Sequence, residues 1–566
     1  LDKAAGGNTG LGQAGNGVPI VNIATPNGAG LSNNHFRDYN VGANGLILNN
    51  ATGKTQGTQL GGIILGNPNL KGQAAQVILN QVTGGNRSTL AGYTEVAGQS
   101  ARVIVANPHG ITCQGCGFIN TPRATLTTGK PIMDGQRLER FQVDGGDIVV
   151  EGAELNVGNL EQFDLITRSA KLNAKLYAKN LNIVTGRNDV QADSLQATPR
   201  AADGSEKPQL AIDSSALGGM YAGAIRLVGT EQGVGVKLAG DMAASGGDIR
   251  IDASGKLSLA QASSQGDLKI AAQAVELNGK TYAGGSAEIR SVEELVNRQS
   301  LAARERIALE AAHIDNAGVI EAGVEPDERR NARGDLELRS GTLRNAGSLV
   351  ASRALEAKAS QALDNQGGSL KGATVRVDGG HLDNRGGKLL AEGELRVEAS
   401  SLDNREDGLL QSWDRAVVKT RGDLDNRGGQ VVGLNELQVQ AAALDNRSAG
   451  LLSSKGDMDI EVARLDNSAG GKLVSERRTL LKADRLDNRS GRIVAGQDLD
   501  LSSRLIDNRA GDISSTSRVV ASAREQLDNR GGKIVGDSGL DITTPRMLNQ
   551  DKGVLASRDG LRLSAT

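Results

Sequence analysis

Few residues in this chain have the type and spacing that catalysis requires. Its only histidines are His35, His109, His313 and His381. His313 and His381 each lie just before an Asp-Asn pair of a repeated motif, and neither stands in the arrangement of a base paired with a nucleophile. The sequence therefore predicts no catalytic site.

Several strings imitate functional motifs. Residues 10–15, GLGQAG, have the glycine spacing of a dinucleotide loop, but no apolar strand precedes them and no helical period follows, so we expect residues 1–15 to be flexible. Residues 536–539, GDSG, resemble a protease nucleophile segment but fall where other repeats place a turn. The Arg-Gly-Asp strings at 333–335 and 421–423 also occupy turn positions, so we interpret all of these as structural.

Cys113 and Cys116 are the only cysteines, spaced as C-x-x-C. Zinc would need a second ligand pair, and a redox C-x-x-C needs a helix amino terminus, so neither is expected. A local disulfide is the preferred interpretation, and two free thiols remain the alternative. We expect no metal and no cofactor.

Two Asn-Pro turns stand apart. Asn67-Pro68-Asn69-Leu70 follows the apolar run Ile63-Ile64-Leu65, and residues 107–111, NPHGI, follow Val103-Ile104-Val105. Pro fixes φ, and Asn bonds its own backbone two residues on, so both segments should turn the chain. Whether they also contact a partner stays open.

The composition indicates a repeating architecture. The 566 residues include 76 Gly but only ten aromatic residues, too few for several ordinary cores. The 64 basic and 66 acidic residues are interspersed, which argues against nucleic-acid binding. Apolar runs stop far short of the ~20 residues of a membrane span. Because the chain lacks an initiator Met and a signal region, we expect a processed or excised piece.

A Leu-Asp-Asn motif or close variant recurs between Asn297 and Asn549 at intervals of 19 to 22 residues. The one longer interval, 29 residues, contains a polar insertion at 325–331. Within one unit, residues 386–404, apolar and polar residues alternate as in half-buried strands, so we expect about three short strands per unit. Such units cannot fold alone, and stacking them predicts an all-β parallel β-helix, a single elongated rod. A leucine-rich repeat is a minor alternative.

The recurring Asn should form an inward ladder along the rod. Leu402 and Asn404 should point inward, and Asp403 and Arg405 should face solvent. The predicted structural ladder comprises Asn365, Asn384, Asn404, Asn426, Asn446, Asn467, Asn488, Asn508 and Asn529.

With its two Asn-Pro turns the sequence resembles the secretion domain of two-partner secretion exoproteins of the filamentous haemagglutinin type, whose hallmarks are an NPNL and an NPNG-I motif. His109 stands where that family usually has Asn. The Leu-Asp-Asn repeats resemble haemagglutinin-type repeats, and Cys113 and Cys116 resemble the contact-dependent growth inhibition branch, CdiA. Further blocks that resemble the family lie at residues 17–23, 34–41, 117–121, 125–129, 182–186 and 216–222.

After the flexible segment (1–15), the resemblance implies a secretion domain (16–245) folded as a right-handed parallel β-helix. Connecting β-helix coils (246–296) and a repeat stalk (297–566) follow. It implies recognition by the periplasmic domains of an outer-membrane β-barrel transporter of the TpsB/CdiB type, and a location at the bacterial cell surface after transit through the periplasm. The implied recognition residues are Asn67, Pro68, Asn69, Leu70, Asn107, Pro108, His109, Gly110 and Ile111.

The implied function is to export and carry a carboxy-terminal toxin, absent from this chain, to neighbouring bacteria. A region also absent would bind the target-cell receptor, and the chain itself should be a non-enzymatic monomer. A haemagglutinin-like adhesin is the alternative. A β-helical polysaccharide-degrading enzyme is a remote one, because Trp413 is the only aromatic residue after Tyr282.

Overall fold

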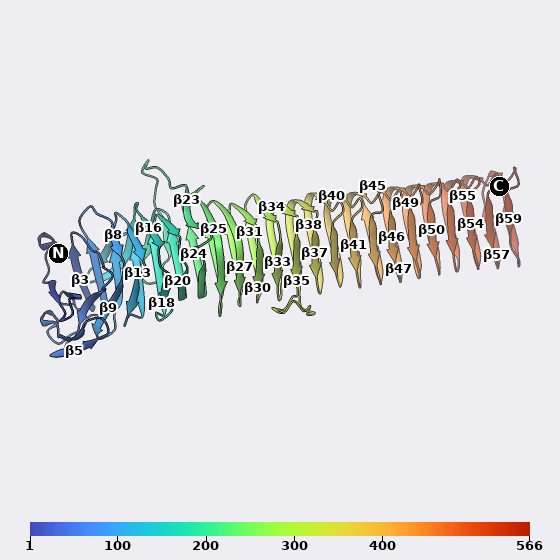
Figure 1. The fold of residues 1–566 in the computed structure, drawn as a ribbon. Coiled ribbons are helices and arrows are strands. Elements are labelled where there is room, and N and C mark those ends of the chain that lie inside the picture. The colour runs from blue at the N-terminus through green and yellow to red at the C-terminus, as the bar shows by residue number, and fades with distance from the viewer. Residues whose placement is uncertain (566) are drawn as a thin grey trace. The chain divides into compact units, whose positions relative to one another are not determined.

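The computed structural model describes residues 1–565 and divides into two compact units, an amino-terminal unit (Leu1–Glu293) and a carboxy-terminal unit that begins at Glu294. Each unit is a parallel β-solenoid, as the sequence predicts, and in Figure 1 the strands of successive coils lie side by side. Among the described residues no helix is long and apolar enough to cross a membrane.

Parallel strands stack the coils of the amino-terminal unit. Val103 and Val105 of β10 face the interior and are almost fully buried. Ile104, between them, lies beside Leu79 of β7 and Thr125 of β13 in register. The strands on this side of the solenoid are β3 (Leu31–Phe36), β7 (Val77–Val82), β10 (Arg102–Ala106), β13 (Arg123–Thr127), β18 (Gln162–Thr167), β20 (Leu176–Thr185) and β24 (Met220–Gly229).

The segment before residue 16 is ordered, which corrects the expectation of a flexible arm. Strand β1 (Gly10–Gln13) pairs antiparallel with β2 (Pro19–Asn22), which in turn pairs with β4 (Leu46–Asn50). The chain reverses at Asn16-Gly17, where Gly17 has a φ of +90° and its N–H donates to the carbonyl of Ala14. Asn-Gly is a strong hairpin signal that explains this pairing. No helix follows β1, so no dinucleotide loop forms.

Two antiparallel elements of the amino-terminal unit lie outside its coils and were not predicted. One is the hairpin of β5 (Thr55–Thr58) and β6 (Gly62–Leu65). The other is a four-stranded sheet, β14 (Lys130–Asp134), β15 (Arg137–Val143), β21 (Asn188–Gln191) and β22 (Ala197–Pro199). Both sheets use chain that leaves the solenoid between successive coils.

In the carboxy-terminal unit a coil has a short strand and a long one, for example β41 (Lys388–Ala391) and β42 (Leu395–Asp403). The expected second and third strands are therefore one bent strand in most coils. They separate at Arg421-Gly422, between β44 (Arg415–Thr420) and β45 (Asp423–Asp425). Leu395, Val397 and Ala399 are buried, as the alternation predicts.

The polar insertion at 325–331 lies at a turn between β35 (Val319–Ala322) and β36 (Leu336–Asn345). Ion pairs such as Arg330–Glu321, 2.6 Å, fold it back on the solenoid. The Asn316 amide still reaches Asn345 across it, at 2.8 Å. The solenoid register thus continues across the extra residues.

Candidate functional site

The first Asn-Pro turn is a buried hydrogen-bonding centre. Asn67 precedes a 3₁₀ turn at Pro68–Leu70, and its Oδ1 accepts the backbone N–H of Asn69 at 2.9 Å. Its Nδ2 donates to the carbonyls of Ile23, 3.0 Å, and Asn49, 2.8 Å. Asn67 is only 5% exposed, so a partner cannot reach its amide in the folded domain.

Asn69 fastens the amino-terminal segment to the same turn. Its Nδ2 donates to the carbonyl of Asn8 at 2.8 Å, and the Thr25 hydroxyl donates to the Asn69 carbonyl at 2.7 Å. Leu70 is buried and Pro68 is exposed. The turn therefore joins residues 8, 23–25 and 49, which lie far apart in the sequence.

The apolar run before this turn differs from expectation. β6 is a strand, but it belongs to the β5–β6 hairpin, and only Ile64 packs inward. Ile63 is 79% exposed and Leu65 is 75% exposed. The alternation of one buried and two exposed aliphatic residues could not be recognised from sequence because all three are apolar.

The second turn follows the same pattern. Asn107 is fully buried, its Nδ2 donates to the carbonyl of Asn86 and to the Ser88 hydroxyl, both at 2.9 Å, and its Oδ1 accepts the N–H of His109. Gly110 has a φ of +108°, a left-handed value that a side chain would strain. His109 is exposed, and its backbone bond to Asn107 does not require the usual Asn.

Arg87 holds this turn and was missed by sequence analysis. Its Nη2 donates to the carbonyl of Ile111 at 2.9 Å, and its Nη1 pairs with Asp147 at 2.7 Å. A Cβ on Gly110 would lie 2.4 Å from that Nη1, so Gly110 leaves room for the guanidinium. No spacing signal in the sequence connects Arg87 with Asp147, 60 residues later.

Cys113 and Cys116 form a disulfide, with their Cα atoms 5.2 Å apart. Cys113 lies on β11 (Ile111–Gln114), directly after the second turn, and Gly115 between the two cysteines has a φ of +78°. Both sulfur-bearing residues are buried, Cys113 completely. The bridge closes a tight turn and offers no exposed thiol for redox chemistry.

The predicted Asn ladder is confirmed in the carboxy-terminal unit. The Asn384 Nδ2 donates to Asn404 Oδ1 at 2.8 Å, and the Asn404 Nδ2 donates to Asn426 Oδ1 at 2.7 Å. The same pairing runs from Asn297 to Asn549. Each asparagine of the ladder from Asn297 to Asn529 is at most 1% exposed. These residues satisfy buried turn carbonyls.

Asp403, which precedes the ladder residue Asn404, is more buried and more closely paired than expected. Its carboxylate accepts from Arg405 Nη2 at 2.7 Å and lies 3.7 Å from Arg385 Nε of the preceding coil. Its side chain is only 15% exposed, so the expectation that it simply faces solvent is wrong. The same in-coil pairing recurs at Asp383–Arg385, Asp425–Arg427, Asp445–Arg447, Asp487–Arg489, Asp507–Arg509 and Asp528–Arg530.

The segments that resemble enzyme or ligand motifs do not come together in one site of the described structure. Asp537-Ser538 is a turn between β56 (Lys533–Gly536) and β57 (Gly539–Thr543). The His313 and His381 rings bond only Thr342 and Ser401 hydroxyls among the hydrogen bonds recorded for them. Asp335 of the first Arg-Gly-Asp string pairs with Arg353, whereas Arg421 and Asp423 of the second are exposed.

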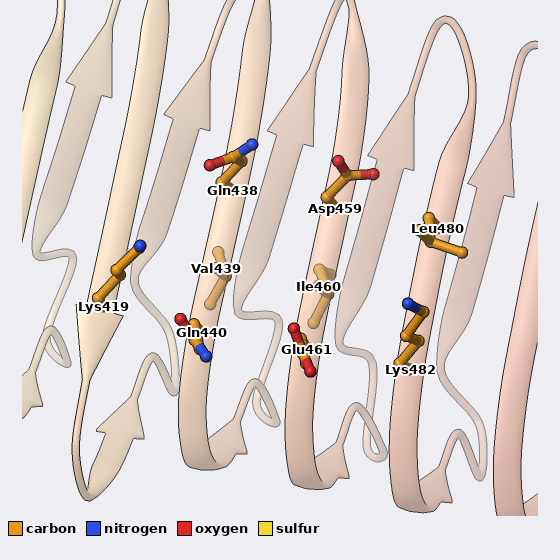
Figure 2. Close-up of a pocket in the computed structure, with 9 residues that line it drawn as sticks. All are labelled: Lys419, Gln438, Val439, Gln440, Asp459, Ile460, Glu461, Leu480 and Lys482. Carbon is orange, nitrogen blue, oxygen red and sulfur yellow. The ribbon is translucent and has the colours of Figure 1, made fainter.

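Figure 2 shows a groove on the outer face of the carboxy-terminal unit, where Lys419, Gln440, Glu461 and Lys482 follow one another in register. Asp459 lies in the neighbouring row. None of the described residues lining it is a histidine or an aromatic residue. In residues 1–565 no group of three or more metal-ligating side chains is placed to hold an ion.

Comparison with known families accounts for most of the chain. The TPS secretion domain family matches residues 1–259. The haemagglutinin repeat family matches residues 330–428, 432–503, 474–531 and 518–566. Both Asn-Pro turns and the disulfide lie within the first match, and most of the Asn ladder lies within the second.

Individual relatives match over a limited part of their own length. The 16S rRNA endonuclease CdiA of Enterobacter cloacae subsp. cloacae is 43% identical over 69% of this chain and 11% of that protein. The tRNA nuclease CdiA of Escherichia coli NC101 is 51% identical over 51% of this chain and 9% of that protein. The filamentous hemagglutinin secretion domain is 31% identical, with 61% of this chain and 97% of that one covered and a TM-score of 0.42. The chain spans about a tenth of the length of the two nucleases.

Proposed function

The chain belongs to the two-partner secretion exoproteins, with a TPS secretion domain and haemagglutinin repeats, and we propose that it is the export signal and stalk of a secreted surface protein. The observation that carries this proposal is the match over residues 1–259, in which both Asn-Pro turns are built into a closed solenoid. The partner would be an outer-membrane β-barrel transporter of the TpsB/CdiB type. Its periplasmic domains would recognise the amino-terminal unit.

If the chain is exported by this route, its two parts should differ in whether they are secreted. Residues 1–259 should be secreted alone in cells that express the transporter, because the export signal lies in this domain rather than in the uniform repeats. Residues 260–566, expressed without the secretion domain, should remain inside the cells that produce them. Secretion of the repeats alone, or retention of residues 1–259 in the presence of the transporter, would contradict the proposal.

The two turns would serve recognition in different ways. Asn67 and Asn107 are buried, so we assign them to shaping the domain that the transporter binds. Pro68 and His109 are exposed and would make any direct contact.

Matched single variants of the full chain separate these roles. Asn67→Ala removes three hydrogen bonds, and at about 1 kcal/mol each, or more where a buried carbonyl is left unpaired, it should cost about 2 to 4 kcal/mol of domain stability. Pro68→Ala and His109→Ala should leave stability within about 0.5 kcal/mol, as exposed changes do. Secretion yield and protease resistance of the purified protein are measured together. If His109→Ala is stable but not secreted, the transporter contacts it directly. If only Asn67→Ala loses secretion, and it loses stability in proportion, the turns act through the fold.

We propose that this chain is part of a longer protein, which delivers a carboxy-terminal toxin to neighbouring bacteria. The support is the 43% and 51% identity to proteins whose names describe nucleases, over a region that is about a tenth of their length. The nuclease activity would then reside outside this chain, and residues 1–566 would not be an enzyme. Purified residues 1–566 should leave tRNA, rRNA and acidic polysaccharides intact, and cleavage of any of them would overturn this assignment. The sequence downstream of Thr566 distinguishes a toxin-like domain from the further repeats of an adhesin.

A further inference from the structure

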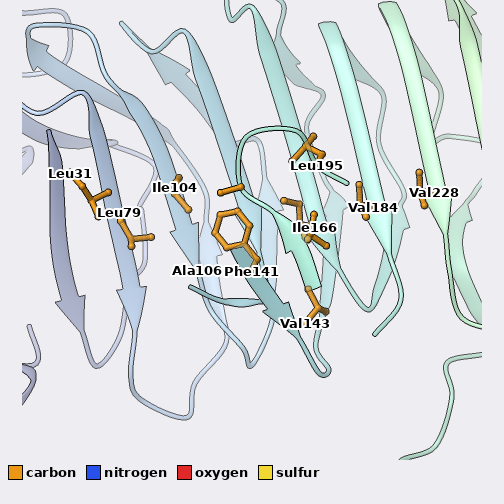
Figure 3. Close-up of a cluster of buried hydrophobic side chains, with 12 residues drawn as sticks. Leu31, Leu79, Ile104, Ala106, Phe141, Val143, Ile166, Val184, Leu195 and Val228 are labelled. Carbon is orange, nitrogen blue, oxygen red and sulfur yellow. The ribbon is translucent and has the colours of Figure 1, made fainter. Parts of the chain in front are cut away.

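The four-stranded sheet of the amino-terminal unit covers one face of its solenoid. We call this sheet, with the loop at residues 192–196, the strap. Phe141, Val143 and Val190 of the strap are fully buried against outward-facing aliphatic side chains of the coils. Figure 3 shows these side chains gathered between the strap and the strands. The coil residues in the cluster are Leu31, Leu79, Ile104, Ala106, Ile166, Val184 and Val228.

The covered residues include the earliest coils of the chain. Leu31 lies on β3, Leu79 on β7 and Ile104 on β10, and each is at most 5% exposed although it points away from the solenoid interior. The strap that covers them is made later in the chain, from residues 130–143 and 188–199. At its tip the Asn27 Nδ2 donates to the carbonyl of Gln136 at 2.7 Å, across 109 residues of sequence.

Two arginines of the coils, Arg102 and Arg123, hold the strap at a second place. Arg102 Nη2 donates to the carbonyl of Ala192 at 2.9 Å, and Arg123 Nη2 reaches the same carbonyl at 3.2 Å. Arg123 also pairs with the fully buried Asp164 at 2.7 Å. Burial lowers the pKa of Arg102 to about 10, which shows how far the strap and coils remove this cation from water. Without the strap, both guanidinium groups lose the Ala192 carbonyl and keep only acceptors on the coils, Thr125 Oγ1 for Arg102 and Asp164 for Arg123.

Ordinary solenoid coils are stabilised by the coils on either side, so they can form one after another. The first coils of this unit have a different requirement, because the aliphatic side chains of Leu31, Leu79 and Ile104 on their outer face need a cover. For Leu31 that cover is encoded more than 90 residues later. A strand with apolar side chains on both faces is stable only when both faces are covered.

We propose that the strap is a latch that makes folding of β3, β7 and β10 conditional on residues 130–199. The amino-terminal unit then folds as one cooperative body, and a partly synthesised or partly threaded chain stays open until the strap is present. This goes beyond the proposed function and is independent of the transporter, because it concerns the purified chain alone.

Hydrogen exchange of the full chain tests the latch. Phe141→Ala loosens the strap at its centre, and Arg137→Asp alters an exposed residue on the same strand as a control. Amides of β3, β7 and β10 should exchange at least about tenfold faster in Phe141→Ala, together with those of the strap, because one opening event exposes them all. Amides of residues 351–545 serve as the internal reference and should not change. Arg137→Asp should match the wild type throughout.

A stronger variant, Phe141→Asp, places a charge in the cluster and should abolish protection of β3, β7 and β10 while residues 351–545 stay protected. The latch is refuted if only the strap exchanges faster in Phe141→Ala while β3, β7 and β10 keep wild-type protection. In that case the strap is an appendage on a solenoid that forms without it. Retained protection of β3, β7 and β10 in Phe141→Asp would refute it equally.

Discussion

Replacing Asn404 by leucine should loosen its own coil and the two neighbouring coils of the carboxy-terminal unit and leave distant coils closed. The Asn404 Nδ2 lies within hydrogen-bonding distance of the Gly408 carbonyl, 2.9 Å, and of Asn426 Oδ1, 2.7 Å. It also reaches the Gln430 carbonyl at 3.1 Å, and its Oδ1 accepts from Asn384 at 2.8 Å. Leucine fills a similar volume but replaces none of these bonds.

The size of the effect follows from which partners are left unpaired. Asn426 Oδ1 has no other recorded donor, so it becomes a buried acceptor without a partner, at about 1 to 3 kcal/mol. Asn384 keeps a bond to the Gly387 carbonyl at 3.2 Å, so its loss is smaller. The Gly408 and Gln430 carbonyls lose a donor each. We expect a total of about 2 to 4 kcal/mol, confined to the coils that contain Asn384, Asn404 and Asn426.

Hydrogen exchange and limited proteolysis of the full chain measure this change locally, which a single melting curve would not. Gln440→Leu is the matched control, since it makes the same amide-to-leucine change on the exposed face of β47 (Glu436–Asp445) and should cost within about 0.5 kcal/mol. Faster exchange throughout residues 297–549 would refute nearest-neighbour stabilisation. Equal tolerance of Asn404→Leu and Gln440→Leu would show that the ladder contributes nothing.

Three further predictions follow from the same structure. Burial raises the pKa of Asp383, but hydrogen bonds from Arg385 and Gln366 outweigh it and set the pKa at about 2. The stability contributed by this pairing should be complete above about pH 4 and should decline as the pH falls toward 2, which exchange rates near residue 383 would show, with Asp383→Asn removing that dependence. The Cys113–Cys116 disulfide should contribute about 2 kcal/mol or less because its loop is short, and alkylation of denatured, unreduced protein from the medium should modify neither cysteine; two modified thiols would show that the pair is reduced. Replacing residues 325–331 by Gly-Gly should leave exchange at Asn316 and Asn345 unchanged, and faster exchange there would mean that the insertion supports the ladder.

The repeat part of the fold could be predicted because its signal is local and repeated. Leu402 and Asn404 recur at the same place in successive units, and the period of two assigns both to the interior. The Asp403–Arg405 pair was misjudged because alternation alone places both on the solvent side. The recurring Asp-Asn-Arg triplet carries the missing information, since an Asp side chain at a turn accepts the N–H two residues on, as Asp403 does from Arg405 at 3.2 Å.

The candidate site could be predicted only in part. The residue types of the two turns indicate their local geometry, and Asn67 and Asn107 adopt it. Their distant partners could not be predicted, because the carbonyls of Ile23 and Asn86 carry no side-chain signal and any turn could meet them. The strap was missed for a related reason: Phe141 and Val143 alternate with polar residues, as any solenoid strand does, and nothing in that pattern says which face they cover.

Chain inserted at a turn has opposite consequences in the two units. In the carboxy-terminal unit the insertion at 325–331 pairs with its own neighbours, such as Glu321, and the ladder continues across it. In the amino-terminal unit the insertion at 130–143 reaches back to Asn27 and buries side chains of six coils. A surface that a partner recognises as an export signal must keep one shape, and contacts between residues distant in sequence fix that shape. A stalk must tolerate changes in length, and contacts limited to adjacent coils permit that. The same solenoid geometry can therefore serve both parts because only the range of the contacts differs.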